Sequence, residues 1–192
     1  MRSLLWILLI GLLQADANPL SLDQLPDGKL PANLKVIKVG SGAVGKVRVT
    51  METVPHPTTG VTEKQRVLEI TGGDASANHY TLVLLNQPLY SGLSISTRFR
   101  IMGGKGVRAA GVIFRMQPNH KDYYLLAVKP EAKEAFWTVF ENGLPAKGFK
   151  YDEDQFVSPK DGWQSIKLQA EENTTRWTLN HRQDFITYNP ET

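Results

Sequence analysis

The chain has 192 residues, a net charge of +3 and no cysteine. The absence of cysteine excludes disulfides, thiolate metal sites, a cysteine nucleophile and lipid attachment at an N-terminal cysteine. It also favours, weakly, a bacterial export route. The modest charge lacks the dense basic stripe of nucleic-acid-binding proteins, so we expect no nucleic-acid partner. The length suits one domain that is held together by its own apolar core.

The first 17 residues have the pattern of a secretory signal peptide. Arg2 precedes an apolar run over residues 4–13, and Ala15-Asp16-Ala17 provides a small-residue cleavage site. The run is too short to span a bilayer, which takes about 20 apolar residues. A membrane anchor and a buried N-terminal helix are the alternatives. We therefore predict signal peptide 1–17 and an exported protein, periplasmic or extracellular, with no integral membrane segment after cleavage.

The next segment, residues 18–33, contains three prolines and no periodicity, which predicts a loop. Short runs of β-branched and aromatic residues follow it. They predict strands over residues 34–39, 44–51, 66–71, 80–86, 92–102, 163–170, 175–180 and 184–188. Within residues 92–102, alternation puts the apolar set that includes Ile95 and Phe99 in the core, and Arg98 and Arg100 on a solvated face. The same alternation predicts Val47, Val49 and Met51 in the core.

Residues 109–147 form the centre of the chain. Three apolar runs are separated by PNHKD and PEAK and are closed by Glu-Asn-Gly. Asn142-Gly143 favours a type I′ hairpin turn, which needs positive φ at both central positions. We predict an antiparallel meander in the middle of a sheet. The Gly-rich stretch at 103–106 is interpreted as a hairpin loop, and residues 148–159 as a polar loop.

Many short strands at regular spacing, without helical periodicity or internal repeats, are typical of an all-β sandwich. Prolines also stay out of the middle of each run, as strands require. We predict one all-β domain over residues 34–192, a two-sheet antiparallel jelly-roll sandwich.

Enzyme motifs are largely absent. The four histidines lack ligand spacing, so no histidine metal site is expected, and the sequence contains neither G-x-S-x-G nor a P-loop. Glu131 and Glu134 flank a turn, where charged residues are expected in any case. The acidic cluster Asp152-Glu153-Asp154 could bind calcium through its oxygens, although it lacks a known loop spacing. We predict no other cofactor.

Aromatic residues of the meander are candidates for binding. In a strand, one residue of each adjacent pair points away from the core, which applies to Tyr123-Tyr124 and to Phe136-Trp137. A Tyr or Trp beside Arg115 would stack on a sugar ring and hydrogen-bond its hydroxyls. The alternative is that these rings fill the core, which we favour for Phe114, Phe136 and Trp163.

Several segments resemble the 3-keto-disaccharide hydrolase domain family, a concanavalin A-like, laminin-G-like jelly roll. The resemblance covers roughly residues 25–186 and is carried by AGVIFR, DYYLL, the F-x-x-x-x-N-G pattern and GWQSIKL. It implies a bacterial exported protein with a carbohydrate-related role, and it matches Arg115, Asp122, Tyr123 and Tyr124 to the family's F-R…D-x-Y-Y positions. The chain departs from the family over residues 127–134. It also lacks a final strand pair, through truncation or loss of an edge strand.

Three functions remain open. The first is a monomeric carbohydrate-binding domain that uses Arg115, Tyr123, Tyr124 and Trp137 on the concave sheet. The second is a hydrolase or lyase acting on 3-keto-glycosides, with Glu134 or Asp122 as general base and Arg115 orienting the sugar. The third is a structural or interaction domain whose aromatics all belong to the core.

Overall fold

A computed structural model describes residues 22–23, 25–40, 42–72, 80–85, 92–103, 108–151, 159, 162–171, 174–181 and 183–188. This part of the chain is all-β, as predicted, and its strands pair antiparallel. The predicted signal peptide 1–17 and the calcium candidate at 152–154 lie outside the described residues. No helix in the described ranges has the length and apolarity to cross a membrane.

The strands fall into two four-stranded sheets and two ribbons. One sheet has the order β12-β11-β10-β5, and the other is the meander β6-β7-β8-β9. The ribbons are β1-β4 and β2-β3. The strand bounds are β1 Leu34–Val39, β2 Lys46–Pro55, β3 Thr62–Thr71, β4 Tyr80–Leu85, β5 Leu93–Arg100, β6 Ala110–Phe114, β7 Tyr123–Lys129, β8 Glu134–Glu141, β9 Leu144–Tyr151, β10 Trp163–Ala170, β11 Thr174–Leu179 and β12 Gln183–Tyr188.

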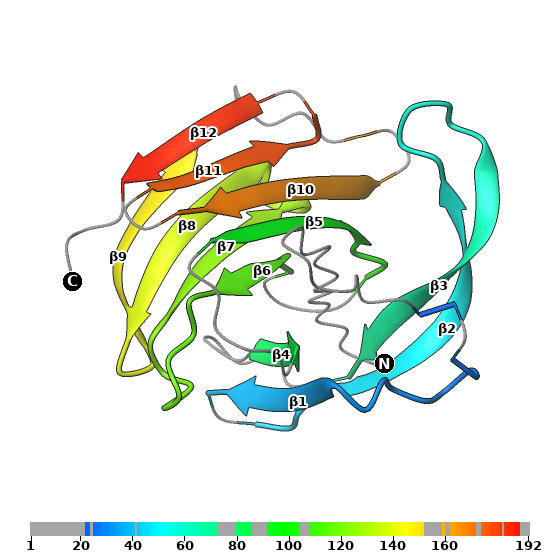
Figure 1. Cartoon of the computed structure of the whole chain (residues 1–192), viewed down its shortest axis with the longest axis horizontal. Helices are drawn as coiled ribbons and strands as arrows, with labels where there is room; N and C mark the ends of the chain where they lie inside the picture. The colour runs from blue at the N-terminus through cyan, green and yellow to red at the C-terminus, as the bar shows by residue number, and fades with distance from the viewer. Residues whose placement is uncertain are drawn as a thin grey trace.

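The two large sheets share one apolar core, an arrangement compatible with a β-sandwich. In Figure 1 the sheet of β5 and β10–β12 lies in the upper part of the view, over the meander. The β1-β4 ribbon lies at the bottom of the view and the β2-β3 ribbon at the right. A single buried cluster contains residues from both sheets, such as Leu168 and Trp177 on one and Val112 and Leu126 on the other. The alternation predicted for β5 is confirmed, because Ile95, Thr97 and Phe99 are buried and the in-phase Leu93 at the strand end is half-buried.

The meander is confirmed, together with its Asn142-Gly143 turn, where both residues have positive φ. The polar loop predicted from residue 148 is wrong at its start. β9 continues to Tyr151, because Gly148 and the three residues after it pair with residues 135–138 of β8.

The prediction that residues 103–106 close a hairpin is also wrong, because the strands before and after them, β5 and β6, belong to different sheets. Residues 104–107 themselves lie outside the described residues. β5 instead pairs along its whole length with β10, about 70 residues later. A Gly-rich stretch between two strands is compatible with either connection, and only the distant partner decides between them.

The burial predicted for β2 holds for half of the strand. Val49 is fully buried, whereas Met51 is 43% exposed and Val54, on the opposite face, is buried. The two-stranded ribbon therefore changes its buried face near Met51. Two-stranded ribbons twist strongly, so a ten-residue strand does not keep one face toward the same core.

Candidate functional site

The register of the meander defines two faces. Phe114, Tyr124 and Trp137 lie on one, here called the first face, and Tyr123 and Phe136 lie on the other, the second face. Both faces contribute buried residues to the core. Tyr123 and Tyr124, which the sequence analysis put into one binding set, therefore point in opposite directions.

On the first face, three aromatic rings form a row. Phe114 and Tyr124 are cross-strand partners whose rings stack at 5.3 Å, and the Trp137 ring lies 5.5 Å from Tyr124. Phe114 and Trp137 are buried, and Tyr124 is half-buried. Tyr124 is thus the middle ring of the row; it reaches the surface between two buried rings, an arrangement that limits its freedom.

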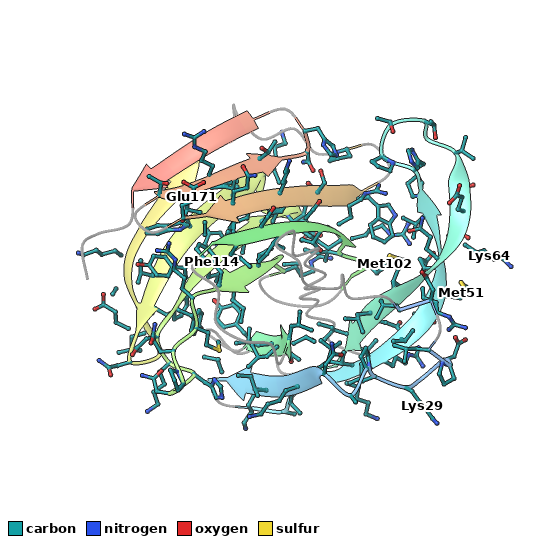
Figure 2. All side chains as sticks on the ribbon, viewed as in Figure 1. Lys29, Met51, Lys64, Met102, Phe114 and Glu171 are labelled. Atoms are coloured by element: carbon teal, nitrogen blue, oxygen red, sulfur yellow. The ribbon has the colours of Figure 1, made fainter. Side chains whose placement is uncertain are left out.

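Arg115 lies over this half-buried tyrosine. Its guanidinium is 5.8 Å from the Tyr124 ring centroid, within the range of cation–π attraction. Its Nη2 donates a hydrogen bond to the backbone carbonyl of Glu171, which directly follows β10. Figure 2 shows Phe114 and Glu171 on the same side of the molecule. The arginine therefore joins the two large sheets and is held beside Tyr124 from both.

The connection between β6 and β7, residues 115–122, carries Arg115 and Asp122. Asp122 accepts two hydrogen bonds of 2.6 Å, one from the side-chain amide of Asn119 and one from the backbone N–H of Asn142. These bonds lower the pKa of the Asp122 carboxyl below its usual 3.8, and the bond from Asn119 has the larger effect. A carboxylate that is stabilised in this way is a weak base and has two acceptor positions already in use.

Asp122 predicts an acid threshold for this turn. Because its pKa is lowered in the folded chain, both bonds persist above 3.8 and are lost as the pH falls through the lowered value. We expect the Asn142 amide resonance to be constant from about pH 8 to about pH 5 and to move only in stronger acid. The Gly143 amide is the control, since it bonds to the Lys121 backbone carbonyl, which does not titrate. A midpoint at or above 3.8 would contradict the bonding.

Glu134, the other candidate base, lies at the far end of the meander. It pairs with Lys129, with 3.3 Å between Lys129 Nζ and Glu134 Oε2, and the same ammonium lies 4.8 Å from the Phe136 ring on the second face. Asp122 directly precedes β7 and Lys129 ends it, seven positions later, which corresponds to about 20 Å along the strand. Glycoside hydrolysis needs two carboxylates within about 10 Å of each other. Glu134 and Asp122 therefore cannot flank one glycosidic bond.

Arg115 and Glu134 are separated in the same way, because Arg115 adjoins the Phe114–Tyr124 pair and Glu134 pairs opposite Lys129. The structure thus brings together Arg115, Tyr124 and Trp137, and it leaves Glu134 apart. Arg115 cannot orient a sugar unit on which Glu134 acts.

Tyr123 and Trp137 are both buried, at 2% and 1% exposure. The Tyr123 ring stacks on Phe140 at 4.6 Å, and Tyr80 from β4 meets Phe140 edge-on. Burial raises the pKa of Tyr123, so its hydroxyl stays protonated. Among the residues described, that hydroxyl has no hydrogen-bond partner. In this structure Trp137 supports the first-face row from inside, and Tyr123 belongs to the packing under β4.

A second arginine–aromatic cluster, which the sequence analysis did not single out, lies on the outer face of β5 and β10. The guanidinium carbons of Arg98 and Arg100 lie 5.4 and 5.1 Å from the Trp163 ring. Arg98 also bonds to the Pro55 carbonyl, and Arg100 pairs with Glu52, so the cluster ties the β2-β3 ribbon to β5. The sequence signal was two arginines two residues apart on one strand face. The partners of these arginines come from other strands, β2 and β10.

Within the described ranges, no group of three or more His, Asp or Glu side chains is arranged to hold a metal ion. The calcium prediction is not addressed, because residues 152–154 lie outside those ranges. No protein-family model, curated protein or solved structure matches this chain.

Proposed function

We propose that this chain is an exported carbohydrate-binding domain of jelly-roll type, which binds a glycoside at Arg115 and Tyr124. The export proposal is supported by the charged and apolar pattern of the first 17 residues. The jelly-roll proposal is supported by two four-stranded antiparallel sheets around one core. The family resemblance, carried by the F-R…D-Y-Y residues, supports the ligand class.

One observation carries the binding proposal: Arg115 is held over the half-buried Tyr124 by a bond to the opposite sheet. Sugar sites combine an aromatic surface for the apolar C–H groups with planar donors for the hydroxyls. A ring supported by Phe114 and Trp137, together with a guanidinium anchored on Glu171, offers both with little freedom left to lose on binding. The two candidate bases of the hydrolase alternative, Glu134 and Asp122, lie at opposite ends of β7, too far apart to act on one glycosidic bond, which favours binding over hydrolysis.

The test is to measure binding of methyl glucoside and of its 3-keto derivative by NMR titration or calorimetry. We expect Tyr124→Ala and Arg115→Ala to weaken binding about tenfold, because each removes contacts with the ligand. Tyr124→Phe should retain most of the affinity, since it keeps the ring and loses only the hydroxyl.

The matched controls are Lys129→Ala and Phe136→Ala, which remove a second cation–aromatic pair at the other end of the meander. They should bind like the wild type. Turnover of the 3-keto sugar by the folded domain would contradict a binding-only role. If the wild type bound neither sugar, or if the control variants lost as much affinity, the site would not lie at Arg115 and Tyr124.

A further inference from the structure

The backbone conformation at Arg115 is itself energetically unfavourable. Arg115 has a φ of 53° and His120 a φ of 56°, so two residues of the β6–β7 connection are in the left-handed region. Residues other than glycine adopt this conformation at a cost, and it persists only where surrounding interactions hold it. The place of Arg115 over Tyr124 therefore depends on what holds residues 115–122.

Inside the connection, backbone and side-chain bonds close the turn. The Gln117 N–H donates to the Asp122 carbonyl at 2.8 Å, and the His120 N–H donates to the Gln117 carbonyl at 2.9 Å. The Asn119 side-chain oxygen accepts from the backbone N–H groups of Lys121 and Asp122. These bonds shape the connection, but none of them attaches it to another strand pair.

Two bonds attach it to the turn between β8 and β9. Asn142 donates its N–H to the Asp122 carboxylate at 2.6 Å, and Gly143 donates its N–H to the Lys121 carbonyl at 2.9 Å. The Asp122 bond is short and charge-assisted, which makes it the stronger of the two. The other Asp122 oxygen accepts from Asn119, so this one side chain joins the inner network to the neighbouring turn.

We infer that Asp122 is a positioning residue, which fastens the connection to the β8–β9 turn and thereby sets the place of Arg115 over Tyr124. This inference rests on the proposed function of the Arg115–Tyr124 site. It gives Asp122 a role in binding without contact with the ligand. It also explains how an aspartate can serve a sugar site while each oxygen of its carboxylate accepts a hydrogen bond from the protein.

The experiment compares Asp122→Ala and Asp122→Asn with the wild type. The alanine removes both acceptors, and we expect it to weaken binding of methyl glucoside about tenfold, as expected for losing a bond to a charged acceptor. The asparagine keeps one acceptor oxygen and should restore part of the affinity. Such rescue separates positioning from simple loss of fold. If the alanine variant does not fold, the asparagine variant carries the comparison.

Backbone resonances give a second readout that needs no ligand. In both variants the Asn142 amide should shift, and the Arg115 and Tyr124 resonances should move with it. The control is Asp27→Ala, since Asp27 is an exposed carboxylate that pairs with Arg66 of β3 and makes no bond to the connection. It should change neither readout.

The outcomes distinguish the two proposals. If the wild type binds sugar and the Asp122 variants bind equally well, the positioning role is overturned and the site stands. If the wild type does not bind, the proposed function fails, and the positioning role of Asp122 is then tested by the backbone resonances alone. Unmoved Arg115 and Tyr124 resonances in the Asp122 variants would then overturn the positioning role as well.

Discussion

Replacing Gly111 by alanine is expected to lower the free energy of unfolding by about 3 kcal/mol or to prevent folding. A Cβ at this position would lie 2.0 Å from the Leu126 carbonyl oxygen and 2.5 Å from the Ala127 Cα. Both are backbone atoms of β7, the strand that pairs with Gly111 across the sheet. Neither can rotate away, so the edge strand β6 would have to separate from β7.

Urea denaturation followed by tryptophan fluorescence measures this effect. Gly92→Ala is the matched control, because a Cβ there would meet nothing within 4 Å, and it should stay within about 0.5 kcal/mol of the wild type. Equal stability of the two variants would show that β6 and β7 do not approach as closely as the structure has them. Loss of soluble protein for Gly111→Ala alone would agree with the prediction.

Trp137→Ala should cost about 3–5 kcal/mol of stability, the usual range for truncating a large buried aromatic residue. Trp137 is among the largest fully buried side chains, and its ring supports Tyr124. The loss of this support should also weaken sugar binding. Trp137→Phe should recover most of both properties, because it keeps a ring behind Tyr124.

The neighbouring residue provides the control. Phe136 lies on the second face and is only half-buried, so Phe136→Ala should cost about 1–2 kcal/mol in the same denaturation experiment. Both variants thus truncate an aromatic side chain to alanine, at adjacent positions on opposite faces. If Phe136→Ala proved the more damaging of the two, the deeper burial of Trp137 would be contradicted.

The structure keeps only part of the residue set that the sequence predicted for carbohydrate binding. Arg115 and Tyr124 lie close together, because Tyr124 pairs with Phe114, the residue before Arg115, at one end of the meander. Glu134 separates from them because it lies at the opposite end of β7 and β8. A sequence places all these residues within 20 positions of one another, but an antiparallel hairpin brings some close and moves others to the far end.

What the sequence by itself determined is local. Period-2 alternation and turn residues predicted the strands, and Asn142-Gly143 predicted its turn, because these patterns reflect the backbone of a few consecutive residues. The tertiary structure decided which strands pair and which face is covered. More than 50 residues of chain separate β5 from β10, its partner in the sheet, and the same is true of Arg115 and the Glu171 carbonyl to which it bonds. Alternation shows that Phe136 and Trp137 point in opposite directions. Because both faces of the meander are packed, only the complete fold could show that Trp137 is the buried one.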